Sequence, residues 1–258
     1  MVNIIFRTCD VVLSVHQVPR PFGLDKKQTI EVSFKSLVAA LIGIPHTITV
    51  LGDKLSEDMR AFFSKYPVLM VEGDFGNDAS IRKSIELACA FPPDEWVYFC
   101  EDDYLHRKET FRYIFNFTDN LSTIIAPPTR KKLFRKGNEE IANADIVVFP
   151  PDYPDRYSPD RRKQSYIFVS KDCHWRQVNS TTFTFLAKSG FINKNKSVFL
   201  TASKNADDGY MSRKLFGKKR FGSKSLCVSP IPSLACHLHT TSMSALIDWE
   251  QIALDCLK

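Results

Sequence analysis

The stretch that decides the fold is Glu95 to His106, EWVYFCEDDYLH, in which an apolar run ends abruptly at three consecutive acids. Residues 96–100 are aromatic, β-branched or small and follow a pair of prolines, which predicts a strand buried on both faces. Glu101, Asp102 and Asp103 come at the end of this strand. Because side chains alternate along a strand, we expect Glu101 and Asp103 on one side and Asp102 on the other if the extended geometry continues.

Three adjacent acids repel one another, so their position beside a buried strand requires a nearby cation or extensive solvation. A divalent metal ion with oxygen ligands, which also binds the phosphates of a substrate, would supply this compensation. The alternative is a solvated acidic turn that follows a core strand. The acids alone do not decide between the two.

The composition is that of an ordinary soluble globular protein. The chain has 258 residues, of which 44% are apolar and 25% charged, enough for one large α/β domain or two small ones. Its seven cysteines, an odd number without regular spacing, indicate reduced thiols. The sequence contains no signal-peptide core and no run of membrane-spanning length, so we expect a cytoplasmic protein.

Basic residues are concentrated in three runs. The net charge is +6, and the runs lie at 130–136, 161–163 and 213–224. Such runs fit a nucleic acid, an anionic membrane surface or a polyphosphate substrate, or they are solvated faces. Peripheral membrane association is therefore left open, and the sequence does not define the oligomeric state.

The first hundred residues alternate between strand and helix patterns. Strands are predicted over 2–6, 47–51, 68–71 and 96–100. Asp25 and Gln28 form a capping-box pair, and Ser56 and Asp78 are expected to cap the next two helices. Short connections between these elements predict a parallel, doubly wound sheet, and ligands bind such sheets beyond the carboxyl ends of the strands.

Polar side chains from separate parts of the chain fall at that edge of the predicted sheet. Arg7 and Thr8 follow the first strand, Asp53 follows the second, and the three acids 101–103 follow the fourth. This convergence favours a binding crevice over a solvated turn.

The second half of the chain predicts shorter elements separated by long irregular segments. Strands are predicted at 147–149, 166–169, 181–186 and 228–234, and helices at 107–117, 187–191, 207–216 and 245–257. The first two of these strands are expected to be antiparallel or to lie at a sheet edge. The long segments are typical of binding surfaces.

Several motifs, each weak alone, make the chain similar to a known family through their order. They are Arg7-Thr8, Gly52-Asp53, GNDASIRKSIELA (76–88), the acids 101–103, Asp207-Asp208 and His237. In this order they resemble nucleotide-sugar glycosyltransferases of the GT-A type, most similar to the family 2 group. The resemblance covers about residues 2–239, although 129–178 match nothing that can be placed.

The resemblance implies an α/β fold of the GT-A type. This is a Rossmann-like, mostly parallel central sheet flanked by helices, with a smaller mixed or antiparallel C-terminal part. A single domain, 1–258, would then consist of a nucleotide-binding half, 1–106, and an acceptor-binding half, 107–258.

The resemblance places the nucleotide at the ends of the first two strands. Thr8 would contact the base or ribose, and Asp53 would accept a hydrogen bond from the base, unless Asp53 is simply a turn residue. Arg7 and Lys83 would reach the ribose or the diphosphate. Glu101 or Asp102, from the acidic segment, would contact the ribose or a metal-bound water.

The metal ligands implied by the resemblance are Asp103 and a late histidine. Asp103 would bind Mg²⁺ or Mn²⁺, which neutralises the charge that develops on a nucleoside diphosphate leaving group. His237 would be the second ligand, with His239 as its competitor. The two histidines behind Cys236 also suit a softer metal such as zinc, but three ligands without a CxxC partner make a structural zinc site improbable.

The resemblance assigns catalysis to the second acid pair. Asp208 would be the general base for a displacement that inverts the anomeric configuration, with Asp207 as the alternative. Either acid could instead cap the following helix. Trp175 and Arg176, with the aromatic-rich segment 151–157, would stack on and hydrogen-bond a sugar acceptor, unless these aromatic residues belong to the core.

The sequence therefore predicts a metal-dependent transferase that moves a sugar from a nucleoside-diphosphate donor to a hydroxyl of a glycan or similar acceptor. A nucleotidyl- or phosphotransferase is the alternative within the same chemistry, although no GxxxxGK[ST] loop is present in the sequence. A basic nucleic-acid-binding module is the alternative from another class, and no nucleic-acid partner is expected. The acidic segment begins with Glu101 rather than an aspartate, which leaves the identity of the nucleotide open.

Overall fold

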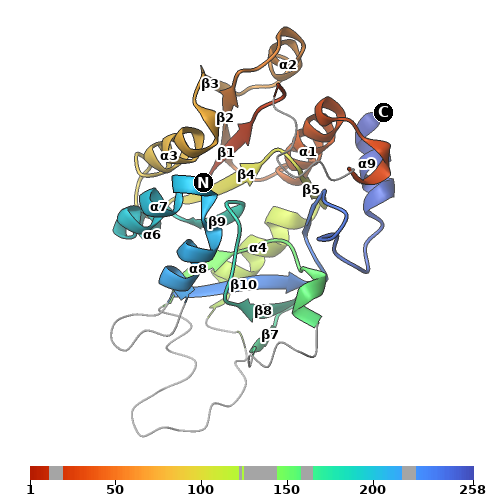
Figure 1. Cartoon of the computed structure of the whole chain (residues 1–258). Coiled ribbons are helices and arrows are strands. Elements are labelled where there is room, and N and C mark those ends of the chain that lie inside the picture. The colour runs from red at the N-terminus through yellow and green to blue at the C-terminus, as the bar shows by residue number, and fades with distance from the viewer. Residues whose placement is uncertain (12–19, 122–123, 125–143, 158–164, 217–224) are drawn as a thin grey trace, which may run out of the picture.

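A computed structural model describes residues 1–11, 20–121, 124, 144–157, 165–216 and 225–258 of the chain (Figure 1). Within these ranges the strands form one nine-stranded sheet in the order β3-β2-β1-β4-β9-β6-β10-β8-β7. A two-stranded sheet, β11-β5, lies beside it. All strands of the large sheet except β8 and β9 run in the same direction.

The N-terminal half forms the parallel part of the sheet. Its strands are β1 (Val2–Thr8), β2 (His46–Asp53), β3 (Leu69–Gly73) and β4 (Trp96–Glu101), and its helices are α1 (Lys26–Ala40), α2 (Glu57–Phe63) and α3 (Gly76–Ala88). The predicted alternation of strand and helix is confirmed. A short 3-10 helix, η1 (Pro21–Gly23), precedes α1.

The C-terminal half extends the same sheet with mixed strand directions. Its strands are β6 (Asp145–Val148), β7 (Ile167–Val169), β8 (His174–Val178), β9 (Phe185–Lys188) and β10 (Ser225–Ile231), and the small sheet consists of β5 (Tyr104–His106) and β11 (Ala235–His237). Strand β9 pairs antiparallel with both β4 and β6. One sheet therefore runs through both of the predicted halves, and the expected fold class, mostly parallel with a mixed C-terminal part, is confirmed.

The helices and 3-10 turns of this half follow the sequence pattern less closely. They are α4 (Thr110–Asp119), η3 (Pro154–Tyr157), α6 (Ser189–Lys194), α7 (Lys196–Ala202), η4 (Lys204–Ala206), α8 (Asp208–Phe216) and α9 (Trp249–Leu257). The predicted helix at 107–117 begins three residues later than expected, and the predicted strand at 181–186 is found instead at 185–188. Strands β5, β8 and β11 and helix α7 were not predicted.

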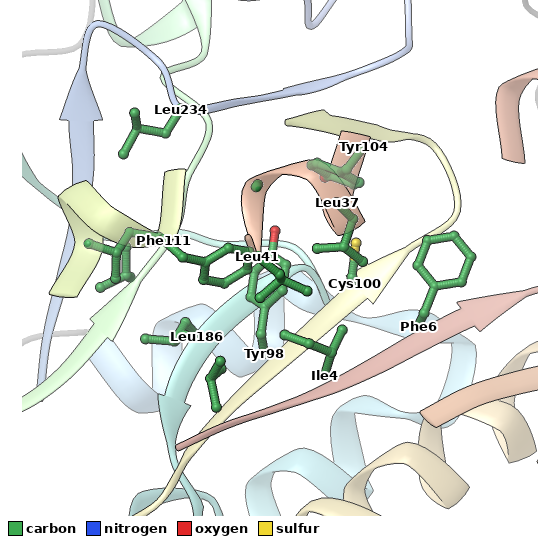
Figure 2. Packing of buried hydrophobic residues seen from close by; sticks show 14 of the residues in the cluster. Ile4, Phe6, Leu37, Leu41, Tyr98, Cys100, Tyr104, Phe111, Leu186 and Leu234 are labelled. Carbon is green, nitrogen blue, oxygen red and sulfur yellow. The ribbon is translucent and has the colours of Figure 1, made fainter. Parts of the chain in front are cut away.

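The side chains of β1 alternate between two apolar cores. Ile4 and Phe6 belong to the core beneath α1, α2 and α4, whereas Ile5 belongs to the core beneath α3, α6, α7 and α8. Figure 2 shows side chains of β1, α1 and β4 packed against one another in the first core. Because both faces are covered, β1 and β4 are buried along nearly their whole length, as the apolar run predicted.

Helix α1 has the predicted capping box. The Asp25 carboxylate accepts a hydrogen bond from the backbone N–H of Gln28, and the Gln28 side chain accepts one from the backbone N–H of Asp25. Ile30, Phe34, Leu37 and Leu41 form the apolar face of the helix and are fully buried. Phe34 makes edge contacts with Phe6, Phe62 and Phe63. The capping box therefore fixes the residue at which α1 begins.

Helix α3 begins earlier than predicted. Asp78 lies in its first turn rather than at its N-cap, and the Asp53 carboxylate at the end of β2 accepts hydrogen bonds from the N–H groups of Phe75 and Gly76. A neighbouring strand thus supplies the cap, which a local sequence motif does not reveal.

A third, smaller core holds the two-stranded sheet in place. Leu105 of β5 and Cys236 of β11 pack against Val32 of α1 and against Trp249 and Ala253 of α9. Helix α1 therefore contacts both sheets and fixes the position of one relative to the other.

Two of the basic runs, 130–136 and 161–163, and the end of the third, 217–224, lie outside the described residues, so their predicted roles remain untested. All seven cysteines are free thiols. In the described part of the chain, every helix is too short or too polar to cross a membrane.

The first prediction concerns a buried histidine, His106, whose Nε2 lies 2.8 Å from the Tyr98 hydroxyl. Burial lowers the pKa of His106 to about 3, whereas an unfolded histidine titrates near 6.5. Between these pH values the unfolded chain binds a proton that the folded chain does not. The free energy of unfolding should therefore fall as the pH drops from about 6.5 towards 3, by on the order of 4 kcal/mol.

Urea unfolding measured across this pH range tests the assignment. His106→Gln should flatten the acid slope, and His46→Gln, at an exposed position, should leave it as in the wild type. An unchanged slope in His106→Gln would show that other groups control acid stability.

Candidate active site

The candidate site lies at the carboxyl edge of the large sheet, where β1 and β4 end side by side. Arg7 is paired in register with Glu101 across these two strands. After Glu101 the chain turns at Asp102 and Asp103 and enters β5, so the extended geometry assumed from the sequence does not continue. Each of the three acids meets a different cation of the protein.

Glu101 is bound by Arg7. Arg7 Nη2 lies 2.5 Å from Glu101 Oε1, and Arg7 Nη1 donates a hydrogen bond to Asn77 Oδ1 in the first turn of α3. Thr184 Oγ1 donates to the second Glu101 oxygen at 3.3 Å. Burial raises the pKa of Glu101, and the charge of Arg7 opposes this rise without cancelling it.

Asp102 joins the ends of three elements. Its carboxylate accepts hydrogen bonds from Thr8 Oγ1 at 2.9 Å and from the N–H of Cys9 at 3.1 Å. Lys26 Nζ, at the start of α1, lies 2.7 Å from both carboxylate oxygens. Asp102 and Thr8 are thus engaged in holding β1, β4 and α1 together, and their predicted contacts with a nucleotide stay predictions.

Asp103 meets His237, which lies 134 positions further along the chain. Antiparallel pairing of β5 and β11 places His237 opposite Tyr104, next to the acid. Asp103 Oδ2 and His237 Nε2 are 3.1 Å apart, whereas Asp103 Oδ1 is shielded from solvent and has no hydrogen-bond partner in the described chain. This carboxylate therefore keeps one oxygen available for a ligand.

Opposing effects act on the pKa values of this pair. Burial alone would raise the pKa of Asp103, but the charge and hydrogen bond of His237, with the charges of Lys26 and Arg20, hold it well below its usual value. Burial would lower the pKa of His237, but Asp103 and Glu101 raise it. These effects favour the protonated imidazolium form of His237 and the ionised carboxylate form of Asp103.

Both ring nitrogens of His237 have partners. Nε2 faces Asp103, and Nδ1 lies 3.3 Å from the Tyr153 hydroxyl. The Tyr104 ring stacks on the imidazole with centroids 4.8 Å apart and an interplanar angle of 4°. Because neither nitrogen is free, His237 is poorly placed to take a proton from an acceptor.

Two residues at this edge, Asp103 and His237, are suited as ligands of a hard divalent ion. Within the described ranges, no group of three or more His, Cys, Asp or Glu side chains is arranged to hold a metal, which gives no support to a zinc cluster. The free oxygen of Asp103 beside His237 does suit Mg²⁺ or Mn²⁺, since such ions take few protein ligands and complete their shell with phosphates and water.

Three other predicted ligand contacts lie away from this centre or are engaged elsewhere. The Asp53 carboxylate caps α3, which is the turn role left open by the sequence. Lys83 forms a 3.9 Å ion pair with Glu86 along α3. His239 Nδ1 lies 2.9 Å from Thr241 Oγ1, and its ring centroid is 5.6 Å from that of His237.

The second acid pair lies at the start of α8. Asp207 Oδ1 accepts a hydrogen bond from the N–H of Tyr210 at 2.7 Å, so Asp207 caps the helix. Asp208 is the first helical residue and lies at the surface, where partial desolvation raises its pKa. The neighbouring η4 is tied to α3 by the Asn205 N–H, which donates to Asp78. Asp207 therefore serves as the helix cap, whereas the Asp208 carboxylate does not.

The predicted acceptor contacts are not supported. Trp175 is fully buried and stacks on Phe117 with centroids 4.3 Å apart, so its ring offers no face to a sugar and the core alternative holds. Arg176 lies over the Tyr157 ring and donates to the backbone oxygen of Arg156.

Sequence reasoning missed three residues around the acids, Arg20, Lys26 and Tyr104. Tyr153 lies in the aromatic segment 151–157 that the resemblance assigned to the acceptor, but its contact with His237 was not predicted. Lys26 was recoverable, because the capping box had already located the start of α1. Tyr104 carried no local signal, since its contact with His237 depends on the pairing of β5 with β11.

No protein-family model matches the chain, and no match was found among curated proteins. Solved structures do match. The chain is similar to the galactosyltransferase LgtC in complex with donor and acceptor sugar analogs, with 13% identity, 83% of this chain and 70% of that chain covered, and a TM-score of 0.43.

Two further structures are similar at the same level. A nucleotidyl transferase from Methanothermobacter thermautotroptrophicus is 13% identical over 100% of this chain and 98% of that chain, with a TM-score of 0.48. The glycosyltransferase GlyE from Streptococcus pneumoniae TIGR4 is 10% identical over 98% of this chain and 63% of that chain, with a TM-score of 0.45. These likenesses concern the fold alone, and the activity must be argued from the chain's own residues.

The contacts of Asp102 generate a stability prediction. Asp102→Asn removes the negative charge that faces Lys26, and both side chains are less than one fifth exposed. Because a largely buried lysine would then lack a counterion, unfolding should be easier by about 3 kcal/mol. Urea unfolding at neutral pH measures this change.

The double variant Lys26→Met with Asp102→Asn should recover part of the lost stability, since no charge is left unpaired. Asp58→Asn provides the matched control. Asp58 of α2 pairs with Lys27, the residue after Lys26 in α1, and this ion pair is exposed, so its loss should change the free energy of unfolding little. Asp102→Asn with wild-type stability but no nucleotide binding would instead make Asp102 a ligand contact.

Proposed function

We propose that the protein is a metal-dependent glycosyltransferase that moves a sugar from a nucleoside-diphosphate donor to a hydroxyl of a glycan or similar acceptor. The observation that carries this proposal is the meeting of Asp103 and His237 at the carboxyl edge of the sheet, together with an Asp103 Oδ1 that has no hydrogen-bond partner among the described residues. Ligands of doubly wound sheets bind at this edge.

The charges around the acids suit a diphosphate. Arg7 is held against Glu101, and the charges of Lys26 and Arg20 lower the pKa of Asp103. These cations leave the edge close to neutral despite three adjacent carboxylates. An incoming diphosphate would therefore not have to overcome the full repulsion of the acids.

A divalent ion would complete this arrangement. Asp103 and His237 would hold Mn²⁺ or Mg²⁺ once the imidazolium had released its Nε2 proton to water, and the ion would supply stabilisation of the negative charge on the leaving nucleoside diphosphate. The contact between Asp103 Oδ2 and His237 Nε2 brings both groups to within reach of one ion before it binds.

Asp208 is the proposed general base. Its carboxylate is not the helix cap, and its raised pKa brings it closer to the pH at which a carboxylate accepts protons efficiently. Attack of the acceptor hydroxyl on the anomeric carbon would break the bond to the diphosphate and invert the configuration.

A thermal-shift panel of UDP-, GDP-, TDP- and CMP-sugars with and without Mn²⁺ tests the proposal. At least one nucleotide should raise the melting temperature only in the presence of Mn²⁺, and a 100-fold excess over Kd is worth about 2.7 kcal/mol. This corresponds to a shift of roughly 5 to 10 °C. Asp103→Ala should abolish the shift.

Asp58→Ala is the control for this panel, because it removes one carboxylate from an exposed position. A shift that survives Asp103→Ala would contradict the proposed metal ligand. Stabilisation by nucleoside triphosphates but by no nucleotide sugar would favour a nucleotidyltransferase instead.

Asp208 and Asp207 are separated by substitution with asparagine. Asp208→Asn should retain the Mn²⁺-dependent shift and lose turnover by about 10²- to 10⁴-fold, the usual contribution of a general base. Asp207→Asn should change turnover little, because asparagine caps helices as well as aspartate does. An exchange of these two results would make Asp207 the base, and loss of the shift in Asp208→Asn would assign Asp208 to binding.

A further inference from the structure

A chain of hydroxyl groups leads from His237 into the protein. Tyr153 Oη lies 3.3 Å from His237 Nδ1 and 3.0 Å from Tyr104 Oη. Tyr104 Oη lies 2.9 Å from Thr182 Oγ1. This series of hydrogen bonds starts at β11, passes through Tyr153 just before η3 and through Tyr104 in β5, and ends at Thr182 just before β9.

From this geometry we propose that Tyr153 is a positioning residue, which accepts a hydrogen bond from His237 Nδ1–H and thereby keeps Nε2 directed at Asp103 and at a bound metal ion. Its metal-binding part rests on the proposed function. The hydrogen bond itself does not, because it is made by the chain's own residues.

The order of donors along the chain follows from the state of His237. An imidazolium has a proton on both nitrogens, and a metal-bound imidazole with Nε2 as the ligand keeps its proton on Nδ1. In both states Nδ1–H is a donor and requires an acceptor. Tyr153 Oη is the acceptor within reach. The Tyr153 hydroxyl then donates its own hydrogen bond to Tyr104 Oη, and the Tyr104 hydroxyl donates to Thr182 Oγ1.

The tyrosine hydroxyls are suited to this role. A neutral phenol both accepts and donates one hydrogen bond in a chain of this kind. The N–H of Thr184 also donates to Thr182 Oγ1 at 3.1 Å, which fixes the far end.

Packing holds the Tyr153 and His237 rings in this arrangement. The Tyr153 ring makes an edge contact with the Phe149 ring, with centroids 5.3 Å apart. The Arg156 guanidinium carbon lies 5.8 Å from the Tyr153 ring centroid. The His237 ring is stacked on Tyr104. Residues that orient metal-binding histidines in this way typically change metal affinity by 10- to 100-fold when they are lost.

Tyr153→Phe tests the proposal because it removes the oxygen and keeps the ring. Tyr98→Phe is the matched control, since it also removes a buried hydroxyl bonded to a histidine, His106, but leaves the acids untouched. Two readouts are needed: the Kd of Mn²⁺ in the presence of UDP, by electron paramagnetic resonance, and the ring N–H signals of ¹⁵N-histidine in the metal-free protein at about pH 6, where the imidazolium is populated.

Tyr153→Phe should weaken Mn²⁺ binding by about 10- to 100-fold and should lose the exchange-protected Nδ1–H signal of His237. Tyr98→Phe should keep both properties. Tyr104→Phe, which keeps the stacked ring, should show a smaller weakening in the same direction and serves if Tyr153→Phe does not fold.

Wild-type Mn²⁺ affinity together with a retained Nδ1–H signal in Tyr153→Phe would overturn the inference. Wild-type protein that binds no Mn²⁺ with any nucleoside diphosphate would overturn the proposed metal site instead. In that case the Nδ1–H signal alone decides whether Tyr153 positions His237.

Discussion

The structure depends on charge compensation at the end of β4. Three adjacent carboxylates beside a buried strand repel one another, and nearby cations reduce this cost. Arg7, Lys26 and His237 each face one of the three acids, and they come from β1, α1 and β11. The acids therefore fix where these elements meet, and the fold and the candidate site arise from the same set of contacts.

The three acids have different physical roles. Asp102 is saturated with hydrogen bonds and joins strands to a helix, whereas one oxygen of Asp103 has no hydrogen-bond partner in the part of the chain that the structure describes. Glu101 lies between these extremes, bound to Arg7 yet electrostatically coupled to Asp103. A stability role for one acid and a ligand role for its neighbour are compatible because the chain turns between them.

The sequence predicted those features that depend on local pattern or on strand order. The capping box at Asp25, the buried strand before Glu101 and the convergence of strand ends all follow from such signals. Strands β5 and β11 have three residues each, too few for a periodicity, so the partner of His237 could be expected only from the resemblance to a family. Trp175 shows the opposite error, because an aromatic next to an arginine has the same sequence signature in a core as in a sugar site.

The central claim is that Asp103 and His237 share one metal ion that also contacts a diphosphate. A crystal grown with Mn²⁺ and UDP, with anomalous diffraction recorded at the manganese edge, tests it most directly. The account predicts an anomalous peak about 2.0 to 2.3 Å from Asp103 Oδ1 and from His237 Nε2, with phosphate oxygens in the same shell. A nucleotide bound at this edge with no peak between the two side chains, or a peak elsewhere on the molecule, would contradict it.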